Sequence, residues 1–437
     1  MNSKLLFWSI TVALGGFLFG LDTAVISGAE QKIQALWQLD NWQHGLAIAM
    51  ALYGTVFGAM FGGVPADKYG RKPTLLWIGI LFFVSAIGAA VAQDVNTFML
   101  ARFIGGLSIG ASSVVAPIYI SEIAPPQYRG RLVIFFQMNI VLGILIAYLS
   151  NYWLQGMGDN DWRWMLGVVA FPSLLFSLMM VFTPESPRWL LLKKGDEEGA
   201  RKILAITEPS VDAAIADIKA SAENDNNGVQ EPFFSKKYSF PIVLAFLFAL
   251  FNQVSGINAI IYFAPRIFEM TGLGKESALI STAGIGIVNL LFTVVGMLLI
   301  DRLGRKTLMY IGSIGYIVSL GLTAWSFYNE SFGGVMYFIF MFIASHAIGQ
   351  GAVIWVFISE IFPNSVRAWG MSLGCFTHWV FAAIITNVFP ILATKFGGGP
   401  IFAFFCVMMV CQLVYVWLMM PETKGASLEE LQKRLTR

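Results

Sequence analysis

The chain has 437 residues, of which 57% are hydrophobic and only 12% are charged, and its mean hydropathy is +0.69. A soluble domain carries about 25% charged residues, so this composition excludes an ordinary soluble fold and indicates a membrane protein. The net charge of +2 gives no indication of nucleic acid as a partner. The three cysteines fall in apolar runs and are interpreted as small hydrophobic residues, and the sequence predicts neither a metal site nor a cofactor.

Apolar stretches of about 20 residues, the length that crosses a bilayer as a helix, recur along the chain. They form two sets of six. The first set covers residues 5–29, 44–65, 73–93, 97–121, 131–153 and 162–183, and the second covers 239–269, 275–300, 307–327, 332–360, 368–394 and 398–420. The first stretch is longer than a signal peptide and has no convincing cleavage site, so it is interpreted as a membrane span.

Charged residues interrupt two of these spans. Asp22 lies in the first span, within FLFGLDTAVISG, and Arg102 enters the fourth, within ARFIGGLSIG. Intramembrane charges are rare, usually paired and functional by default. An aspartate takes up a proton when its pairing weakens, because burial disfavours its ionised form, whereas arginine does not readily lose one. The alternative interpretation is a purely structural ion pair.

The interval between the two sets is polar. It contains amphipathic pieces at 197–206 and 211–222, followed by a polar stretch at 223–228, which predict short helices and then a flexible linker. The predicted organisation is therefore an N-terminal six-helix bundle (1–183), a cytoplasmic linker with short helices (184–238), a C-terminal six-helix bundle (239–420) and a cytoplasmic tail (421–437).

The basic residues predict the orientation of the chain in the membrane. If the N-terminus is cytoplasmic, most of the 28 lysines and arginines fall in cytoplasmic loops, in the 184–238 interval or in the C-terminal tail. This asymmetry follows the positive-inside rule and places both termini in the cytoplasm.

The seventh span carries polar residues at membrane depth. Within FNQVSGINAIIYFAP, Ser255 and Gly256 separate Gln253 from Asn258, and Pro265 follows. A helix is easily broken at such a point, and a break would let both amides face one cavity. An interrupted helix with clustered amides is typical of a transporter site, although a kinked packing helix whose amides bond to its neighbours is the alternative. A second break is predicted in span 10, at 349–351.

The two halves repeat each other. The matching pairs, at nearly constant spacing, are 62–72 (GGVPADKYGRK) with 296–306 (GMLLIDRLGRK), 122–129 (EIAPPQYR) with 360–367 (EIFPNSVR), and 184–185 with 421–422 (both PE). With PESPRW at 184–189, PETKG at 421–425 and QVSGIN at 253–258, the chain resembles a sugar porter of the major facilitator superfamily. It is similar to bacterial sugar/proton symporters and to animal facilitative glucose transporters over nearly its whole length. The resemblance implies an all-α membrane protein with twelve transmembrane helices in two parallel-repeat six-helix bundles.

The resemblance also implies a sugar site. Amides suit a neutral solute covered with hydroxyls, because they both donate and accept hydrogen bonds, and aromatic faces pack on the C–H surface of a sugar ring. The implied substrate-binding residues are Gln137, Asn252, Gln253, Asn258, Asn289, Trp355 and His378, with Phe19, Tyr262 and Trp379 lining or gating the cavity. For each aromatic residue alone, ordinary packing is the alternative.

Four positions depart from the pattern of many relatives. Asn252 precedes Gln253 where they carry two glutamines, Ile144 occupies a position that is glutamine in some bacterial symporters, and Ala352 replaces a frequent proline. His378 replaces an amide, so it is interpreted as a neutral substitute that could bond sugar or sense pH. His44 and His346 have no evident role.

The loop motifs carry paired charges. In similar proteins such charges lock the two halves together at the cytoplasmic rim when the cavity opens outward, whereas solvated rim charges are the alternative. The implied gating charges are Asp67, Arg71, Glu122, Arg129, Glu185, Asp301, Arg305, Glu360, Arg367 and Glu422.

The sequence therefore predicts a proton-coupled monosaccharide symporter, not an enzyme, that works by alternating access. Proton-coupled relatives carry Asp and Arg at the positions of Asp22 and Arg102, and animal facilitators lack the acid. The alternatives are a facilitative sugar uniporter and, less favoured because the cytoplasmic segments are short, a sugar sensor that does not transport. The expected partners are the monosaccharide, the proton and the lipid bilayer of a plasma membrane, the inner membrane of a bacterium, with the protein acting as a monomer.

Overall fold

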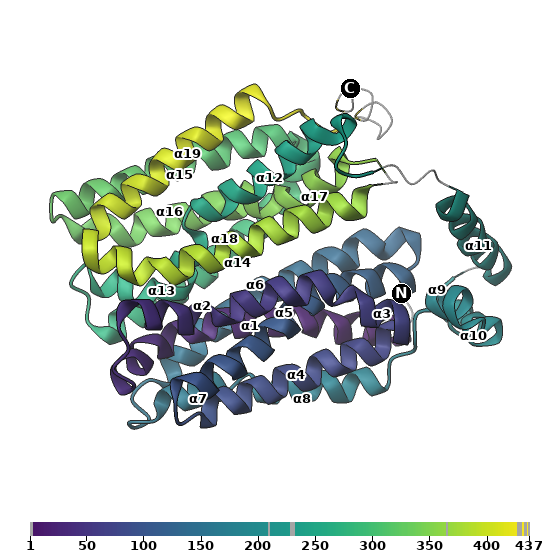
Figure 1. Ribbon diagram of the computed structural model, residues 1–437, viewed down its shortest axis with the longest axis horizontal. Helices are drawn as coiled ribbons and strands as arrows, with labels where there is room; N and C mark the ends of the chain where they lie inside the picture. Colours follow the sequence, from purple (N-terminus) through teal and green to yellow (C-terminus); the bar gives the residue numbers. More distant parts are fainter. Residues whose placement is uncertain are drawn as a thin grey trace. The chain divides into compact units, whose positions relative to one another are not determined.

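The structure is a computed structural model that describes residues 3–208, 210–227, 232–363, 366–425, 431 and 435, and the side chains of 126–131, 133 and 221–227 lie outside that description. Every regular element in this part of the chain is a helix (Figure 1). The membrane-length helices and their parts are α1 (Ser3–Leu36), α2 (Asn41–Phe61), α4 (Arg71–Val91), α5 (Val95–Ile123), α6 (Pro126–Leu154), α7 (Asp161–Gly167), α8 (Ala170–Val181), α12 (Ser239–Val254), α13 (Ile257–Glu269), α14 (Lys275–Leu303), α15 (Arg305–Tyr328), α16 (Val335–Ile348), α17 (Gln350–Ile361), α18 (Arg367–Phe396) and α19 (Gly398–Leu418).

Twelve segments of the described residues are long and apolar enough to cross a bilayer, which confirms the predicted number of spans and the all-α fold. A helix satisfies its backbone polar groups internally, as the hydrocarbon core requires. Two spans differ from the prediction in detail. The first continues to Leu36, because Glu30 and the residues after it favour helix. The sixth divides into α7 and α8 around Val169.

The predicted break in span 10 is confirmed. α16 ends at Ile348 and α17 begins at Gln350, because Gly349 adopts a non-helical backbone with φ −86° and ψ −99°. A Cβ at Gly349 would lie 2.9 Å from the Cα of Gly312 on α15, so the glycine also allows the two helices to approach closely.

The chain divides into two compact units. The first contains Met1–Thr23, Tyr53–Ile144 and Leu166–Gln230, and in it α4 packs against α5 and α8. The second contains Ala24–Leu52, Leu145–Met165 and Glu231–Arg437, and in it α15 packs against α16 and α19, and α12 against α18. The second unit therefore joins the end of α1 and the start of α2 to helices of the C-terminal half. The predicted bundle boundaries at 183 and 239 remain a prediction.

Small residues bring the helices of the first unit together. A Cβ at Gly20 of α1 would lie 1.8 Å from the carbonyl oxygen of Ile140 on α6, and one at Gly58 of α2 would lie 2.3 Å from that of Leu107 on α5. Membrane helices pack backbone to backbone through such positions.

The interval after α8 forms the predicted short helices. These are α9 (Pro187–Trp189), a π-helical turn at Leu190–Lys194, α10 (Glu197–Thr207) and α11 (Val211–Asn227). Their small core is formed by Leu190, Leu191, Ala200, Leu204 and Ile215. The prediction of a linker beginning at 223 was wrong, because α11 continues to Asn227, and each added residue of an existing helix contributes a backbone hydrogen bond.

Candidate functional site

The break in span 7 divides it into α12 and α13. Gly256 adopts φ +88°, a left-handed conformation that favours glycine, and directs the chain into α13. The hydroxyl of Ser255 donates to the backbone carbonyl of Asn252 at 2.6 Å, which stabilises the end of α12. The helix is distorted again in the turn before Pro265, where Phe263 has φ −119° and ψ 20°. The predicted interruption is confirmed.

The break brings the predicted amides together. Nδ2 of Asn258 donates to Oε1 of Gln253 at 2.6 Å, and Nε2 of Gln253 donates to Oδ1 of Asn252 at 2.9 Å. All three side chains are buried, so each bond avoids the penalty of an unpaired polar group.

The amide chain continues through residues that the sequence analysis did not identify. Nδ2 of Asn252 donates to Oε1 of Gln350 at 3.2 Å, Nε2 of Gln350 to Oε1 of Gln412 at 2.8 Å, and Nε2 of Gln412 to the hydroxyl of Ser313 at 2.8 Å. Gln350 starts α17 directly after the break in span 10, and this position could have identified it. Gln412 stands alone in the apolar α19, where a buried amide also indicates a polar partner.

His378 lies beside this chain on α18. Nε2 of Gln253 is 3.2 Å from both ring nitrogens of His378. The His378 ring packs against Trp355, with centroids 5.2 Å apart, and edge-on against Trp379 at 4.8 Å. The break in span 7, the break in span 10 and α18 therefore place amides, an imidazole and two indoles together. Such a set matches a neutral, hydroxyl-bearing solute.

The two intramembrane charges pair as predicted. Nη1 of Arg102 on α5 donates to Oδ1 of Asp22 on α1 at 2.8 Å, and Nη2 donates to the backbone carbonyl of Asp22 at 3.1 Å. Both side chains are 2% exposed. Oδ2 of Asp22 has no hydrogen-bond partner among the described residues.

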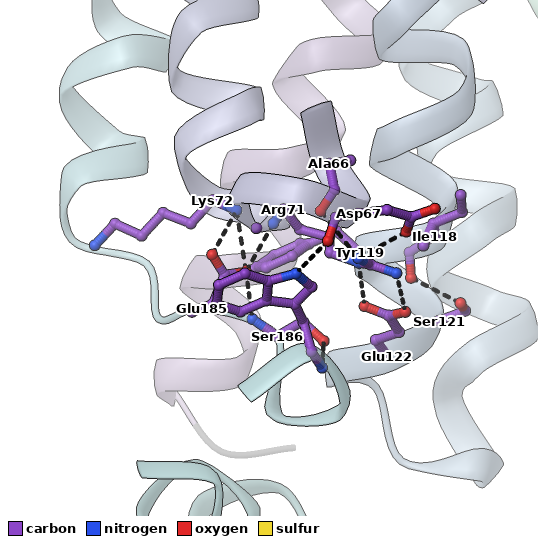
Figure 2. Close-up of polar contacts among 12 residues, drawn as sticks. Ala66, Asp67, Arg71, Lys72, Ile118, Tyr119, Ser121, Glu122, Glu185 and Ser186 are labelled. Atoms are coloured by element: carbon purple, nitrogen blue, oxygen red, sulfur yellow. Dashed lines mark hydrogen bonds and ion pairs between the residues drawn. The ribbon is translucent and has the colours of Figure 1, made fainter. Parts of the chain in front are cut away.

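A charge network in the first unit lies where α4 begins (Figure 2). The guanidinium of Arg71 donates to both oxygens of Glu122 on α5, at 2.9 and 3.0 Å, and lies 3.0 Å from Asp67. The carboxylate of Glu185 accepts hydrogen bonds from the backbone N–H groups of Arg71 and Lys72, which begin α4. Burial raises the pKa of Glu185, and these backbone bonds and the charge of Arg71 oppose the rise.

The second unit repeats this network. Arg305 donates to both oxygens of Glu360, at 3.1 and 2.8 Å, and lies 3.3 Å from Asp301. The carboxylate of Glu422 accepts from the backbone N–H groups of Arg305 and Lys306, which begin α15. Internal duplication is thus visible in side-chain geometry as well as in the motifs.

Comparison with known proteins identifies the family. Residues 8–435 match the family described as "Sugar (and other) transporter". The chain belongs to this sugar transporter family. It is 38% identical to the arabinose-proton symporter of Bacillus subtilis (strain 168), over 97% of this chain and 94% of that protein. It is 33% identical to the D-xylose-proton symporter of Escherichia coli (strain K12), over 99% of this chain and 96% of that protein.

Solved structures give the same result. The inward-open conformation of the xylose transporter XylE from E. coli matches with a TM-score of 0.88 and 30% identity, over 99% of this chain and 100% of that one. The proton:xylose symporter XylE bound to 6-bromo-6-deoxy-D-glucose matches with a TM-score of 0.82 and 31% identity, over the full length of both. The predicted major facilitator fold is confirmed.

The other sugar-site candidates are distributed over both units. Tyr262 is fully buried on α13 and Asn289 is buried on α14, both in the second unit. Gln137 on α6 and Phe19 on α1 are half-buried and belong to the first unit. Of the gating candidates, the side chain of Arg129 lies outside the described residues. Arg367 donates from Nε to the carbonyl of Phe362 at 3.3 Å, and its Nη2 has no hydrogen-bond partner in the described part of the chain.

His44 and His346, which had no evident role in the sequence, both have partners. Nδ1 of His346 on α16 pairs with the hydroxyl of Tyr316 on α15. His44 lies in a buried charge cluster with Glu30 and Arg266. The rule that intramembrane charges are functional, which identified Asp22, could have identified Glu30 too. The predicted span ended at residue 29, one position before it.

Proposed function

We propose that this protein is a proton-coupled monosaccharide symporter, for a hexose or a pentose, that works by alternating access in the plasma membrane. The family and the amide cluster suit a facilitative uniporter equally well. The observation that carries the proposal is the buried ion pair of Asp22 and Arg102, because it supplies a titratable acid at membrane depth. The named proton symporters among the relatives support the same mechanism.

The proton acts on this pair. With Asp22 ionised, the attraction and the 2.8 Å hydrogen bond to Arg102 hold α1 to α5. Protonation removes the negative charge of Asp22, so its side-chain contact with Arg102 falls from an ion pair to a weaker hydrogen bond, while the bond of Arg102 to the backbone carbonyl of residue 22 remains. The barrier to closing over bound sugar then falls. Release of the proton to the more alkaline cytoplasm restores the pair.

The sugar binds at the amide cluster. We assign Gln253 and Asn258 to its hydroxyls, with Trp355 packing on the C–H face of the ring and Asn252 and His378 holding Gln253 in position. Tyr262, Trp379 and Asn289 are assigned to the walls of the cavity. Gln137 and Phe19 are assigned to the site from the resemblance.

The charge networks around Arg71 and Arg305 stabilise the cytoplasmic ends of their helices. Each described ion pair joins helices of a single unit. We assign to these networks, from the resemblance, the lock that holds the halves together while the cavity faces outward. From the distribution of the basic residues we also place both termini and the segment 184–238 in the cytoplasm, and we treat the monomer as the working unit.

Transport into proteoliposomes tests the proposal. Purified protein is reconstituted, and uptake of labelled xylose, arabinose, glucose and galactose is followed with and without an inside-alkaline pH gradient. A symporter that couples one proton to one sugar accumulates sugar about tenfold per pH unit, because one unit supplies about 1.4 kcal/mol. Equilibration without accumulation would establish the uniporter, and no uptake of any of these sugars would reject a monosaccharide substrate.

A further inference from the structure

A buried charge cluster joins the two sequence halves in the second unit. Nε and Nη2 of Arg266 on α13 donate to the two oxygens of Glu30 on α1, at 3.0 and 2.7 Å. Nη2 of Arg266 also donates to Oε1 of Gln34 at 2.7 Å. Nε2 of His44 on α2 lies 2.9 Å from a Glu30 oxygen, although without the angle of a hydrogen bond. We call these four residues the Glu30 cluster.

The cluster is desolvated. The side chains of Glu30 and His44 are fully buried, and that of Arg266 is 21% exposed. A buried carboxylate needs a compensating partner, and the forked arginine supplies two charge-assisted bonds. The edge of the His44 ring also packs against Phe263, with centroids 6.0 Å apart. Separating Glu30 from Arg266 therefore requires water to replace both bonds.

The cluster and the Arg305 network lie at opposite ends of α14. The cluster is on α13 shortly before α14 begins at Lys275, whereas Arg305 directly follows the end of α14. A helix of 29 residues is roughly 40 Å long, so the two sites lie on opposite sides of a bilayer. With the orientation of the proposed function, the Glu30 cluster is on the external side.

Backbone contacts surround the cluster at this end. A Cβ at Gly45 of α2 would lie 1.9 Å from the carbonyl oxygen of Asn387 on α18. The hydroxyl of Tyr148 on α6 donates to the carbonyl of Ile261 on α13 at 2.9 Å. Helices from the two sequence halves are thus closed against each other here, and the cluster is the charged part of that closure.

We propose that the Glu30 cluster is the external gate of the transporter, a clasp that must part before the cavity opens to the outside. This inference rests on alternating access as proposed above. While α1 and α2 are closed on α13, Glu30 and Arg266 satisfy each other. When the helices separate, both charges must be hydrated individually. The clasp therefore favours the externally closed state, and weakening it shifts the population toward the externally open one.

The neighbouring ion pair of Lys32 and Asp161 provides a matched control. It joins α1 to α7, both of which belong to the N-terminal half, so it does not cross the closure. Lys32→Gln removes a charge two residues from Glu30 without loosening the clasp. If charge at this end of α1 had only a general stabilising role, Lys32→Gln would act like a substitution of Glu30. If the Glu30 cluster is a clasp, only the substitutions at Glu30 and Arg266 should have an effect.

The test measures access to Ile261, which is only 8% exposed. Ile261→Cys is introduced after Cys375, Cys406 and Cys411 are replaced by alanine, and a membrane-impermeant maleimide is applied outside intact cells. Glu30→Gln and Arg266→Gln should each raise the labelling rate about fivefold or more, whereas Lys32→Gln should leave it within twofold. The double variant Glu30→Gln/Arg266→Gln should label no faster than the faster single variant, because both remove one interaction.

Equal labelling of the parent and the two glutamine variants overturns the clasp, and so does a Lys32→Gln rate as high as theirs. Size-exclusion profiles check folding. If the glutamine variants misfold, Arg266→Lys decides, because it keeps the charge but loses the fork and should label about two- to threefold faster. Labelling requires no sugar, so the two proposals can fail separately. If the protein takes up no sugar in proteoliposomes but shows these differences in labelling rate, the proposed substrate is refuted and the gate is supported.

Discussion

Asp22→Asn separates proton coupling from sugar binding. The asparagine keeps an oxygen where Asp22 accepts from Nη1 of Arg102 at 2.8 Å, and Arg102 keeps its bond to the backbone carbonyl. The substitution removes the charge of the acceptor while the donor stays charged, so the contact changes from an ion pair to a hydrogen bond with one charged partner and weakens by about 1–2 kcal/mol. That change imitates the protonated state. The variant should fold and bind sugar, but it has no proton to exchange.

The assay uses proteoliposomes with an inside-alkaline gradient of one pH unit. Wild type should accumulate sugar about tenfold, whereas Asp22→Asn should reach only equal concentrations. Both should exchange labelled for unlabelled sugar across the membrane at similar rates. Asp161→Asn, which neutralises another buried acid, should accumulate like wild type. Accumulation by Asp22→Asn, or a wild type that does not respond to the gradient, would refute the coupling role.

Other expected outcomes follow from the same geometry. Gln253→Ala or Asn258→Ala should weaken the free energy of sugar binding by about 1–3 kcal/mol, which raises the Kd roughly 5- to 150-fold. Kd values within twofold of wild type would place the site elsewhere. Single cysteines at Asn226 and Asn160 should react from opposite sides of the membrane, and labelling of Asn226 from outside would contradict the topology. Because burial raises the pKa of Glu185 above its ordinary 4.5, its ionisation opposes folding, and thermal stability should fall as pH rises from below that value through the raised pKa. Glu185→Gln should remove that part of the pH dependence, and an unchanged profile would assign it to other groups.

Local chemistry made the break in span 7 predictable. Ser255 and Gly256 between two amides indicate a break regardless of what surrounds them, and the break alone is enough to bring Gln253 beside Asn258. Gln412 was beyond this reasoning, because its partner Gln350 is 62 residues away and only the packing of α19 brings them together.

The Glu30 cluster shows a second limit of sequence reasoning. Span prediction scores hydropathy, so it ended the first span as soon as the polar residues from Glu30 onward lowered the average. The helix nevertheless continues to Leu36, and Arg266, 236 residues away, neutralises Glu30 within it. Hydropathy averaged over neighbouring residues cannot show that a charged residue has a partner far away in the sequence. Asp22 was identified only because apolar residues follow it.

The amide chain has a direction, and that direction decides what a bound sugar would meet. Each NH2 group from Asn258 onward donates to the next amide oxygen, and the series ends on the hydroxyl of Ser313. One hydrogen of Asn258 is thereby committed to Gln253, and in the proposed sugar site Asn258 would offer its Oδ1 as a hydrogen-bond acceptor. A sugar bound there must therefore supply a hydrogen-bond donor at this position. A sugar hydroxyl can donate this hydrogen bond. Fluorine in the same position cannot, because it has no hydrogen to donate and its lone pairs would face those of the amide oxygen. Reversing any single amide would reverse its neighbours too, so five amides on four helices together determine which hydrogen-bonding group Asn258 offers.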